Sequence, residues 1–436
     1  MNETLIACML IVMLFGLLFS GLWVAFSLIA ITVVTLLFYS DWSTIGSIMA
    51  TATWGTSAHW TLTALPLFIW MGEILYRTHL SDDLFHGLAP WVERLPGRLL
   101  HVNVLGCGVF AAVSGSSTAT CATVGKIALP ELSGRNYPRS IAVGSLAASG
   151  SLGILIPPSI IMIVYGGAAD VSVAQLFIAG VLPGLLLMAM FSGYIGAYSL
   201  IRPGAIPKAE RRTQTFTEML KASRRMIPVV LLIGFVIGSI YAGLATPTEA
   251  AGIGVFGALI LSAFYRVLTW DSFKQSLVGA TMTSCMIAFI MAAAAMLSVA
   301  MGFAGIPRAV AEALTAMQLS PYLFLLGLAA LLIILGCFLD GISIVLLTTA
   351  VLIPAVRAYG FDMVWFGVFL IIAIEISMIT PPVGFNLFVV QDLTKMDPFS
   401  IAKASLPFFF VMLISIVLLT VYPEIATYLP SKVILR

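Results

Sequence analysis

Long apolar runs follow one another along almost the whole chain, and only short polar stretches separate them. A membrane-spanning helix needs about 20 apolar residues, so a chain of this length has room for roughly ten to thirteen spans. The first run, residues 4–40, carries no charged residue and is far longer than the apolar part of a signal peptide. Because Gly16 and Gly21 interrupt it, we predict two short consecutive helices there rather than a cleaved leader.

The composition strengthens this interpretation. Of the 436 residues, 61% are hydrophobic and 9% are charged, whereas soluble domains carry about 25% charged residues. The predicted fold class is therefore an all-α polytopic protein embedded in the lipid bilayer. The formal net charge is only +2, which gives no reason to expect a nucleic-acid partner.

One polar interval divides the chain into two halves. Residues 202–225 hold seven of the 21 Lys and Arg residues. Cytoplasmic loops of membrane proteins carry an excess of basic residues, so we predict that this interval is a cytoplasmic linker.

The two halves share a pattern of prolines. Four prolines recur 224 residues later: Pro130, Pro157, Pro158 and Pro183 reappear as Pro354, Pro381, Pro382 and Pro407. A proline inside a helix removes a backbone donor and breaks the helix. Prolines that merely punctuate unrelated helices would rarely agree four times at one offset, so the pattern favours a duplicated structure. Repeats with helices broken at matching places are typical of secondary transporters. Hydropathy alone leaves open whether the repeats are inverted.

Each repeat also predicts a re-entrant helical hairpin before its Pro-Pro pair. Residues 108–132 are rich in small and hydroxyl residues, and the stretch Ser114-Gly115-Ser116-Ser117 within them favours a turn over a helix. The matching window, residues 335–347, places Asp340 and Gly341 at a similar distance before the second Pro-Pro pair. Such backbone is tolerated at membrane depth only where protein or a water-filled cavity covers it.

The Pro-Pro breaks favour ion binding. An unwound helix leaves carbonyl oxygens without N–H partners, and these oxygens can bind Na⁺, while helix N-termini attract anions. The alternative interpretation is that both breaks are structural kinks only.

Three acidic residues in apolar segments are candidates for function. Asp340 could contact a cation or substrate, or it could lie at an interface between helices, and the sequence does not decide between the two. Glu249 follows Thr248, which would cap a helix while Glu249 lies in its first turn. Glu375 could have a functional role or could only contact a neighbouring helix, and the sequence leaves both interpretations open. The sequence has no nucleophile pattern and no metal-ligand spacing of histidines, so a carrier is favoured over a membrane-embedded enzyme. A passive channel would not need duplicated breaks.

Five segments carry a family resemblance: SGSSTATCATVGKIALPEL, ASGSLGILIPPSIIMIVYG, VSVAQLFIAGVLPGLLL, ATPTEAA and ITPPVGFNLFV. Together they resemble the large membrane subunit of tripartite ATP-independent periplasmic (TRAP) transporters, over nearly the whole chain. The resemblance implies an elevator-type carrier built from inverted repeats. It also implies Na⁺-coupled uptake of a small organic acid across the bacterial inner membrane.

The resemblance implies two separate partners and a division of the chain. The partners are a small four-helix membrane subunit and a periplasmic binding protein that delivers the substrate. The alternative is a Na⁺- or H⁺-driven carrier of the same fold that works without a binding protein. The expected division is a scaffold at residues 1–100 and 226–320, two transport-domain repeats at residues 101–200 and 321–436, and the linker at residues 201–225.

Site residues follow from the resemblance as well. One Na⁺ site would involve Ser114 and the backbone of Gly153, Ile156 and Pro158, and a second would involve Gly336 or Asp340 with Thr380 and Pro382. Substrate would lie between the hairpin tips, near Ser116, Ser117 and Asn386. Many family members carry an Asp after the first turn. Here residues 118–123 read TATCAT. This chain therefore has no carboxylate at that position to take the role that it would have in those members.

Overall fold

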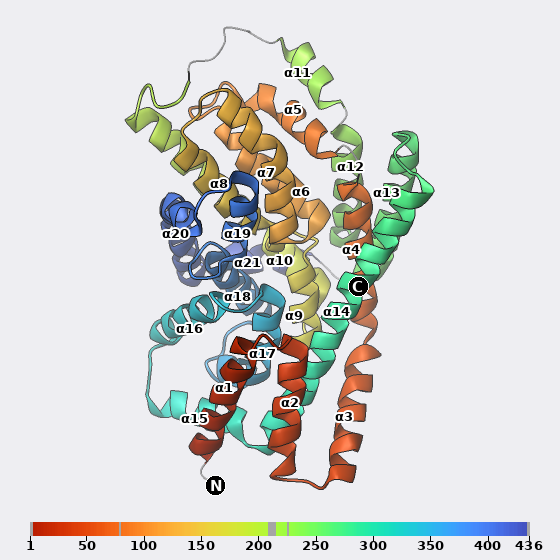
Figure 1. Cartoon of the computed structure of the whole chain (residues 1–436), viewed down its shortest axis with the longest axis vertical. Helices are drawn as coiled ribbons and strands as arrows, with labels where there is room; N and C mark the ends of the chain where they lie inside the picture. The colour runs from red at the N-terminus through yellow and green to blue at the C-terminus, as the bar shows by residue number, and fades with distance from the viewer. Residues whose placement is uncertain (1–2, 78–79, 208–214, 225, 434–436) are drawn as a thin grey trace.

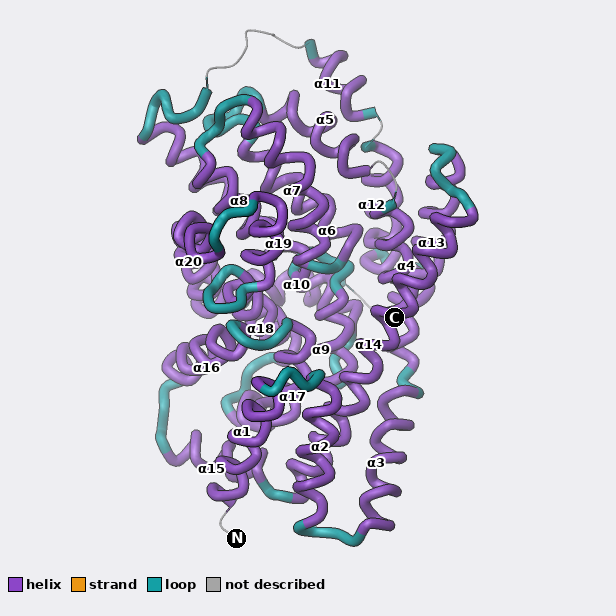
Figure 2. The backbone as a smooth tube through the Cα atoms, in the orientation of Figure 1, coloured by secondary structure: helices purple, strands orange, loops and turns teal. Residues whose placement is uncertain are grey.

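The protein is a bundle of helices, seen in a computed structural model that describes residues 3–77, 80–207, 215–224 and 226–433. These residues form helices, turns and loops, and no strand occurs among them (Figure 2). The predicted all-α fold is therefore confirmed. Four basic residues of the predicted linker, Lys208, Arg211, Arg212 and Arg225, lie outside the described residues.

The first half contains ten α-helices and two short 3₁₀ helices among its described residues. They are α1 Glu3–Phe19, α2 Val24–Leu37, α3 Trp42–Ser57, η1 Trp60–Thr63, α4 Ala64–Tyr76, α5 Leu80–Val92, α6 Leu100–Ser114, α7 Ser117–Gly134, α8 Arg139–Ser151, η2 Leu152–Ile154, α9 Ile160–Ala169 and α10 Val173–Ile201. The first apolar run forms two helices, as predicted, and Gly21 between them has a φ of +83°, a conformation that glycine adopts readily.

The second half follows a similar order in its described residues. Its helices are α11 Phe216–Ser223, α12 Ile227–Tyr241, α13 Pro247–Phe264, α14 Trp270–Phe303, α15 Ile306–Ala316, α16 Pro321–Gly336, α17 Gly341–Ala358, α18 Met363–Met378, α19 Phe385–Thr394, α20 Pro398–Val421 and α21 Glu424–Lys432. Helices α7 and α17 begin and end 224 residues apart, the offset of the repeated prolines. One difference stands out, because α3 and α4 are separate helices whereas the single helix α14 covers the matching stretch.

Fewer helices are long enough to cross a membrane than the hydropathy pattern predicted. Among the described residues, five helices are long and apolar enough to do so, or six if α11 and α12 form one bent span. Six further apolar helices contain only 10–17 residues. The expected ten to thirteen spans were the number for which the chain length leaves room if each is one continuous helix of about 20 residues, but turns and breaks leave several apolar helices shorter than that.

Two groups of helices pack side by side. In one group α14 runs along one side of the molecule and contacts α2, α3 and α4, while α13 packs against α4 and α12 (Figure 1). In the other group α6, α7, α8 and α20 pack together, and α18 contacts α10, α16 and α20. In the view of Figure 1, α6 and α7 lie in the upper half and α16 and α17 in the lower half.

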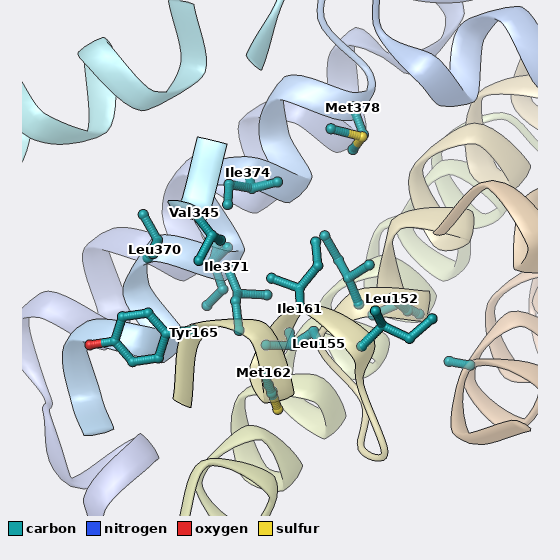
Figure 3. Packing of buried hydrophobic residues seen from close by; sticks show 14 of the residues in the cluster. Leu152, Leu155, Ile161, Met162, Tyr165, Val345, Leu370, Ile371, Ile374 and Met378 are labelled. Carbon is teal, nitrogen blue, oxygen red and sulfur yellow. The ribbon is translucent and has the colours of Figure 1, made fainter. Parts of the chain in front are cut away.

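The two halves of the chain meet in a shared apolar core. Ile161 of α9 faces Ile371 and Ile374 of α18 (Figure 3), and all three side chains are at most 5% exposed. The Tyr165 hydroxyl donates a hydrogen bond of 2.7 Å to the carbonyl of Met363 at the start of α18. This core holds the broken region of the first half against the second half.

The cap of α13 differs from the predicted one. Thr246, not Thr248, caps the helix, and its Oγ1 accepts a hydrogen bond from the Glu249 N–H at 3.3 Å. The Glu249 carboxylate accepts from the Thr246 N–H at 2.8 Å, so the predicted capping role of Glu249 is confirmed as a capping box. The choice of Thr248 was wrong because Pro247 occupies the first helical position, which proline favours, and the cap precedes it.

Candidate functional site

The first hairpin turns where the hydroxyl-rich segment predicts. Helix α6 ends at Ser114, Gly115 follows with a φ of +59°, and Ser116 caps α7 by accepting a hydrogen bond from the Ala119 N–H. Glycine takes this left-handed conformation without the strain that a Cβ would add. The turn is therefore short, and it places hydroxyl groups at the tip.

The first Pro-Pro pair lies directly beside this tip. Helix α8 ends at Ser151, and α9 begins at Ile160 after the break. The Pro157–Pro158 peptide bond is cis. The Ile160 N–H donates a hydrogen bond of 3.4 Å to the carbonyl of Gly115, and a Cβ at Gly115 would lie 3.0 Å from the carbonyl oxygen of Pro158. The hairpin tip and the broken helix are thus joined through their backbones.

Oxygen atoms gather between the tip and the break. The Ser114 hydroxyl lies 2.7 Å from the Thr120 hydroxyl and 3.2 Å from the carbonyl oxygen of Ser116. A Cβ at Gly153 would overlap that carbonyl oxygen and would lie 2.7 Å from Oγ1 of Thr120. Of the residues predicted for the first Na⁺ site, the structure brings Ser114 and Gly153 together and places the Pro158 carbonyl at the adjoining tip.

Two details of this cluster were not foreseen. Thr120 was not singled out from the sequence, although it lies in the hydroxyl-rich run and one helical turn after the cap. Ile156, which was singled out, donates its N–H to the carbonyl of Leu152 at 3.0 Å. Its side chain packs against Gly184 of α10.

The second half of the chain joins its hairpin tip and its break in the same way. Helix α18 ends at Met378, the Pro381–Pro382 bond is cis, and the Val383 N–H donates a hydrogen bond of 3.2 Å to the carbonyl of Cys337. One backbone N–H just after each Pro-Pro pair therefore donates to the hairpin in the same half of the chain.

The residues predicted for the second Na⁺ site are only partly gathered. A Cβ at Gly336 would overlap the fully buried Ser377 hydroxyl, so the end of α16 packs directly on α18. The Thr380 hydroxyl donates to the carbonyl of Ile376 at 2.7 Å, and the Thr380 carbonyl oxygen lies 2.9 Å from where a Cβ of Gly384 would be. Ser377 was not predicted as part of this site. The sequence feature that could have pointed to it is its position three residues before Thr380.

Asp340 caps α17. Its carboxylate accepts hydrogen bonds from the N–H groups of Ile342 and Ser343, at 3.1 and 3.2 Å, and a further hydrogen bond from the Ser343 hydroxyl. The described contacts of this carboxylate thus lie in the first turn of its own helix. Its part in a Na⁺ site stays a prediction.

A cavity of about 760 Å³ lies between the two hairpin tips and the first helices of the chain. Ser116, Ser117 and Asp340 line it. Residues of α1, α2, α14, both hairpins and both breaks complete the lining: Phe15, Leu18, Phe19, Gly21, Leu22, Trp23, Val24, Ala25, Gly115, Thr118, Ile154, Ile160, Ile161, Met286, Phe289, Ile290, Phe338, Leu339, Gly341, Ile342, Met378, Val383 and Phe385. Two predicted substrate residues therefore face this space together.

Asn386, the third predicted substrate residue, does not line this cavity among the described residues. It is fully buried in α19, and its Nδ2 donates a hydrogen bond of 3.0 Å to the carbonyl of Ala147 in α8. Its observed contact therefore links the two halves of the chain.

Glu375 is fully buried in α18, and neither carboxylate oxygen has a hydrogen-bond partner within the part of the chain that the structure describes. It does not line the cavity. Buried ionisable groups in membrane proteins are candidates for function, and the sequence had left this residue open.

Broken helices beside a cavity, in an apolar helical chain, define the class of membrane transporters. The family model described as "Tripartite ATP-independent periplasmic transporter, DctM component" matches residues 11–425. The chain therefore belongs to the DctM family of TRAP transporter large permeases, multi-pass proteins of the bacterial inner membrane. The recognised family and location are confirmed, and the relatives are permeases rather than enzymes.

Individual relatives agree with this assignment. The chain is 35% identical over 377 residues to the C4-dicarboxylate TRAP transporter large permease protein DctM of Pseudomonas aeruginosa, covering 86% of this chain and 87% of that protein. It is 32% identical to the DctM of Vibrio cholerae, covering 97% of each. It is 30% identical to the sialic acid TRAP transporter large permease protein SiaM of Vibrio cholerae, covering 95% of this chain and 96% of that protein.

A solved structure supports the fold. The Alcanivorax borkumensis YdaH transporter, whose structure is described as having an unusual topology, matches with a TM-score of 0.62 and 14% identity, over 89% of this chain and 90% of that one. At this identity the match concerns the fold alone.

Proposed function

We propose that the protein couples the entry of Na⁺ to the uptake of a small organic acid. The observation that carries this proposal is the cluster of Ser114, Ser116 and Thr120 oxygens packed on Gly153 at the first break. Hydroxyl and carbonyl oxygens at an unwound helix are the ligands that transporters use for Na⁺. The second site would use the carbonyls around Gly336, Thr380 and Pro382, with Asp340 nearby in the chain.

The proposed mechanism is elevator-type alternating access by inverted repeats, with two re-entrant hairpins. It is supported by the recurring order of elements and by the cavity, which has α1, α2 and α14 on one side and the hairpin tips on the other. The backbone hydrogen bonds from Ile160 to Gly115 and from Val383 to Cys337 tie each tip to its break. Tips and breaks would then move as one body past the first group of helices, carrying ion and substrate together.

The partners of this chain are proposed from the family. Large permeases of this family work with a small membrane subunit and a periplasmic binding protein. The isethionate TRAP transporter permease protein DctMQ of Oleidesulfovibrio alaskensis is 32% identical over 368 residues, which are 84% of this chain but 57% of that longer protein. We propose that a separate small subunit braces α2–α4 and α12–α14, and that a binding protein delivers the substrate.

Transport assays test the coupling. Proteoliposomes holding the chain with its small subunit would receive labelled succinate, isethionate or sialic acid together with the cognate binding protein. An inward Na⁺ gradient should drive uptake of the accepted acid, and an equal K⁺ gradient should not. Uptake driven equally by both gradients would overturn Na⁺ coupling.

The same assay separates the alternative mechanism. A carrier of this fold that works without a binding protein would accumulate the acid when the soluble partner is omitted. A proton-driven carrier would respond to a pH gradient imposed without Na⁺. The proposed mechanism predicts no accumulation in either condition.

A further inference from the structure

We infer that α11 and the end of α5 form a binding surface for anionic phospholipid at the cytoplasmic face of the membrane. The lipid headgroup binds the basic side chains of Lys221 and Arg224, and the apolar side chains of Phe216 and Leu220 enter the same leaflet beside it. This surface gives a role to the polar interval of the sequence, to which transport of the substrate assigns none.

The polar interval is strongly basic and precedes a membrane helix. Residues 202–225 hold seven Lys and Arg residues against two Glu residues, which leaves a formal charge of +5. The next helix is α12, an apolar helix whose exposed side chains include Leu231 and Phe235. Basic clusters directly beside a membrane-spanning helix bind anionic headgroups, because the cytoplasmic leaflet carries a negative surface potential.

Helix α11 lies against α5 through one of its faces (Figure 1). Met219 and Ser223 of α11 are at most 5% exposed. The Ser223 hydroxyl donates a hydrogen bond of 2.9 Å to the carbonyl of Gly87 in α5, and it accepts one of 2.8 Å from Nε1 of Trp91. These contacts fix which side of α11 is covered and which side is exposed.

An apolar edge of α11 stays uncovered. Phe216 is 65% exposed and Leu220 is 48% exposed, and residues four apart lie on the same side of a helix. The Phe216 ring meets the Trp91 ring of α5 edge to face, with centroids 5.9 Å apart, and Trp91 is itself 40% exposed. Short helices that combine such an edge with basic side chains are typical of the membrane interface.

The basic side chains of α11 are exposed beside this edge. Lys221 lies in the last turn and Arg224 is the C-cap, and neither forms an ion pair with a residue that the structure describes. Arg224 follows Leu220 by four residues, so it lies next to the apolar edge. The acidic residue of α11, Glu218, is in the first turn, where it accepts a hydrogen bond of 2.8 Å from the Thr215 N–H.

A lipid bound at this surface supports the first hairpin through α5. Helix α5 packs against α11 and also against α6 and α7, the two helices of that hairpin. A headgroup that fastens α11 to the leaflet therefore stabilises the contact between α11 and α5. Because a ligand of the folded state stabilises it, we expect anionic phospholipid to raise the melting temperature.

Thermal stability of the purified permease with its small subunit tests this inference. Phosphatidylglycerol replaces phosphatidylcholine stepwise in mixed micelles, at constant total lipid and constant NaCl. Phosphatidylglycerol should raise the melting temperature above the value in phosphatidylcholine alone. Glycerophosphoglycerol, the same headgroup without acyl chains, should have no effect, because the site lies in the interface and needs an inserted lipid.

Charge variants locate the site. A basic residue near an anionic surface contributes about fivefold in affinity, so Lys221→Gln with Arg224→Gln should need about 25-fold more phosphatidylglycerol for half of the effect. Lys221→Arg with Arg224→Lys keeps both charges and should respond like the unchanged protein. The matched control is Arg308→Gln with Lys395→Gln, which removes two charges from side chains that are at least 81% exposed elsewhere, and it should respond fully.

Three outcomes would overturn the inference. Equal melting temperatures in the two lipids would show that no anionic lipid is bound, and an equal effect of glycerophosphoglycerol would indicate a site for a soluble anion. A loss in the control pair as large as in the α11 pair would assign the response to total charge. None of these outcomes concerns the response to Na⁺, so the proposed function is tested separately.

Discussion

Gly153, at the first helix break, packs against the carbonyl oxygen of Ser116 at the tip of the first hairpin. A Cβ at Gly153 would overlap this oxygen and would lie 2.7 Å from Oγ1 of Thr120. Two stretches nearly forty positions apart in the chain thus approach as closely as their backbones allow, and the proposed Na⁺ ligands lie where they meet.

Gly153→Ala should therefore displace the proposed ligands. We expect the Na⁺-specific rise in melting temperature to disappear in this variant, because the added methyl group must push the tip away from the break. The control is Gly234→Ala in α12, where a Cβ would meet no atom within 4 Å. Differential scanning fluorimetry in NaCl and KCl measures both. A full Na⁺ response in Gly153→Ala would show that this contact does not form the site.

Asn386→Ala tests whether Asn386 serves the structure or the substrate. The variant loses the hydrogen bond from Nδ2 to the Ala147 carbonyl, so we expect it to lower the free energy of unfolding by roughly 1 to 2 kcal/mol and to keep its response to Na⁺. Unchanged stability together with lost substrate-dependent stabilisation would instead favour the substrate contact that the family resemblance implies.

Glu375→Met should stabilise the protein. The substitution removes two buried oxygens that have no partner in the described structure and fills the site with an apolar side chain of similar length. Burying a polar group without a hydrogen bond costs about 1 to 3 kcal/mol, so the free energy of unfolding should rise by an amount in this range. The comparison variant is Glu131→Met, on the partly exposed surface of α7. A large loss of stability in Glu375→Met would mean that the carboxyl has a bound partner.

Thr246→Ala and Thr248→Ala form a matched pair at the start of α13. Loss of the cap in Thr246→Ala should cost about 1 kcal/mol, whereas Thr248→Ala should be nearly neutral, because Thr248 lies inside the first turn and does not cap it. Chemical unfolding of both variants in the same detergent measures the difference. Equal losses in the two variants would contradict the observed capping box.

Much of the fold could be predicted from residues whose backbone chemistry is distinctive. The two Pro-Pro pairs at one offset predicted where helices break, and Ser114 to Ser117 predicted the first turn, because proline and glycine restrict or free the backbone locally. The other repeated prolines lie inside continuous helices: Pro130 in α7, Pro183 in α10, Pro354 in α17 and Pro407 in α20. The number of continuous helices could not be predicted in this way. Separate helices α3 and α4 match the single helix α14, and packing against neighbours decides between the two.

The candidate site was predictable in part for the same reason. From their distances to the Pro-Pro pairs, we matched Ser114 with Asp340. In the structure Ser116 and Asp340 are the equivalent residues, because each caps the second helix of its hairpin. Caps depend on which residue starts the helix, a choice that one or two residues of register can change. Thr120 contacts the nearby Ser114 and the distant Gly153, and Ser377 contacts the distant Gly336. The local pattern marks the stretches in which they lie, but the distant contacts decide which residue of each stretch joins the cluster.

The central claim is that Na⁺ binds at the broken helices, and the most direct test is the thermal stability of the purified protein in NaCl, KCl and choline chloride at equal ionic strength. A ligand at about 100 times its dissociation constant stabilises the folded state by roughly 2.7 kcal/mol. We predict that Na⁺ alone raises the melting temperature and that the double variant Pro157→Ala, Pro158→Ala abolishes this rise while remaining folded. Equal melting temperatures in the three salts, or a Na⁺ response that survives in the double variant, would contradict the claim.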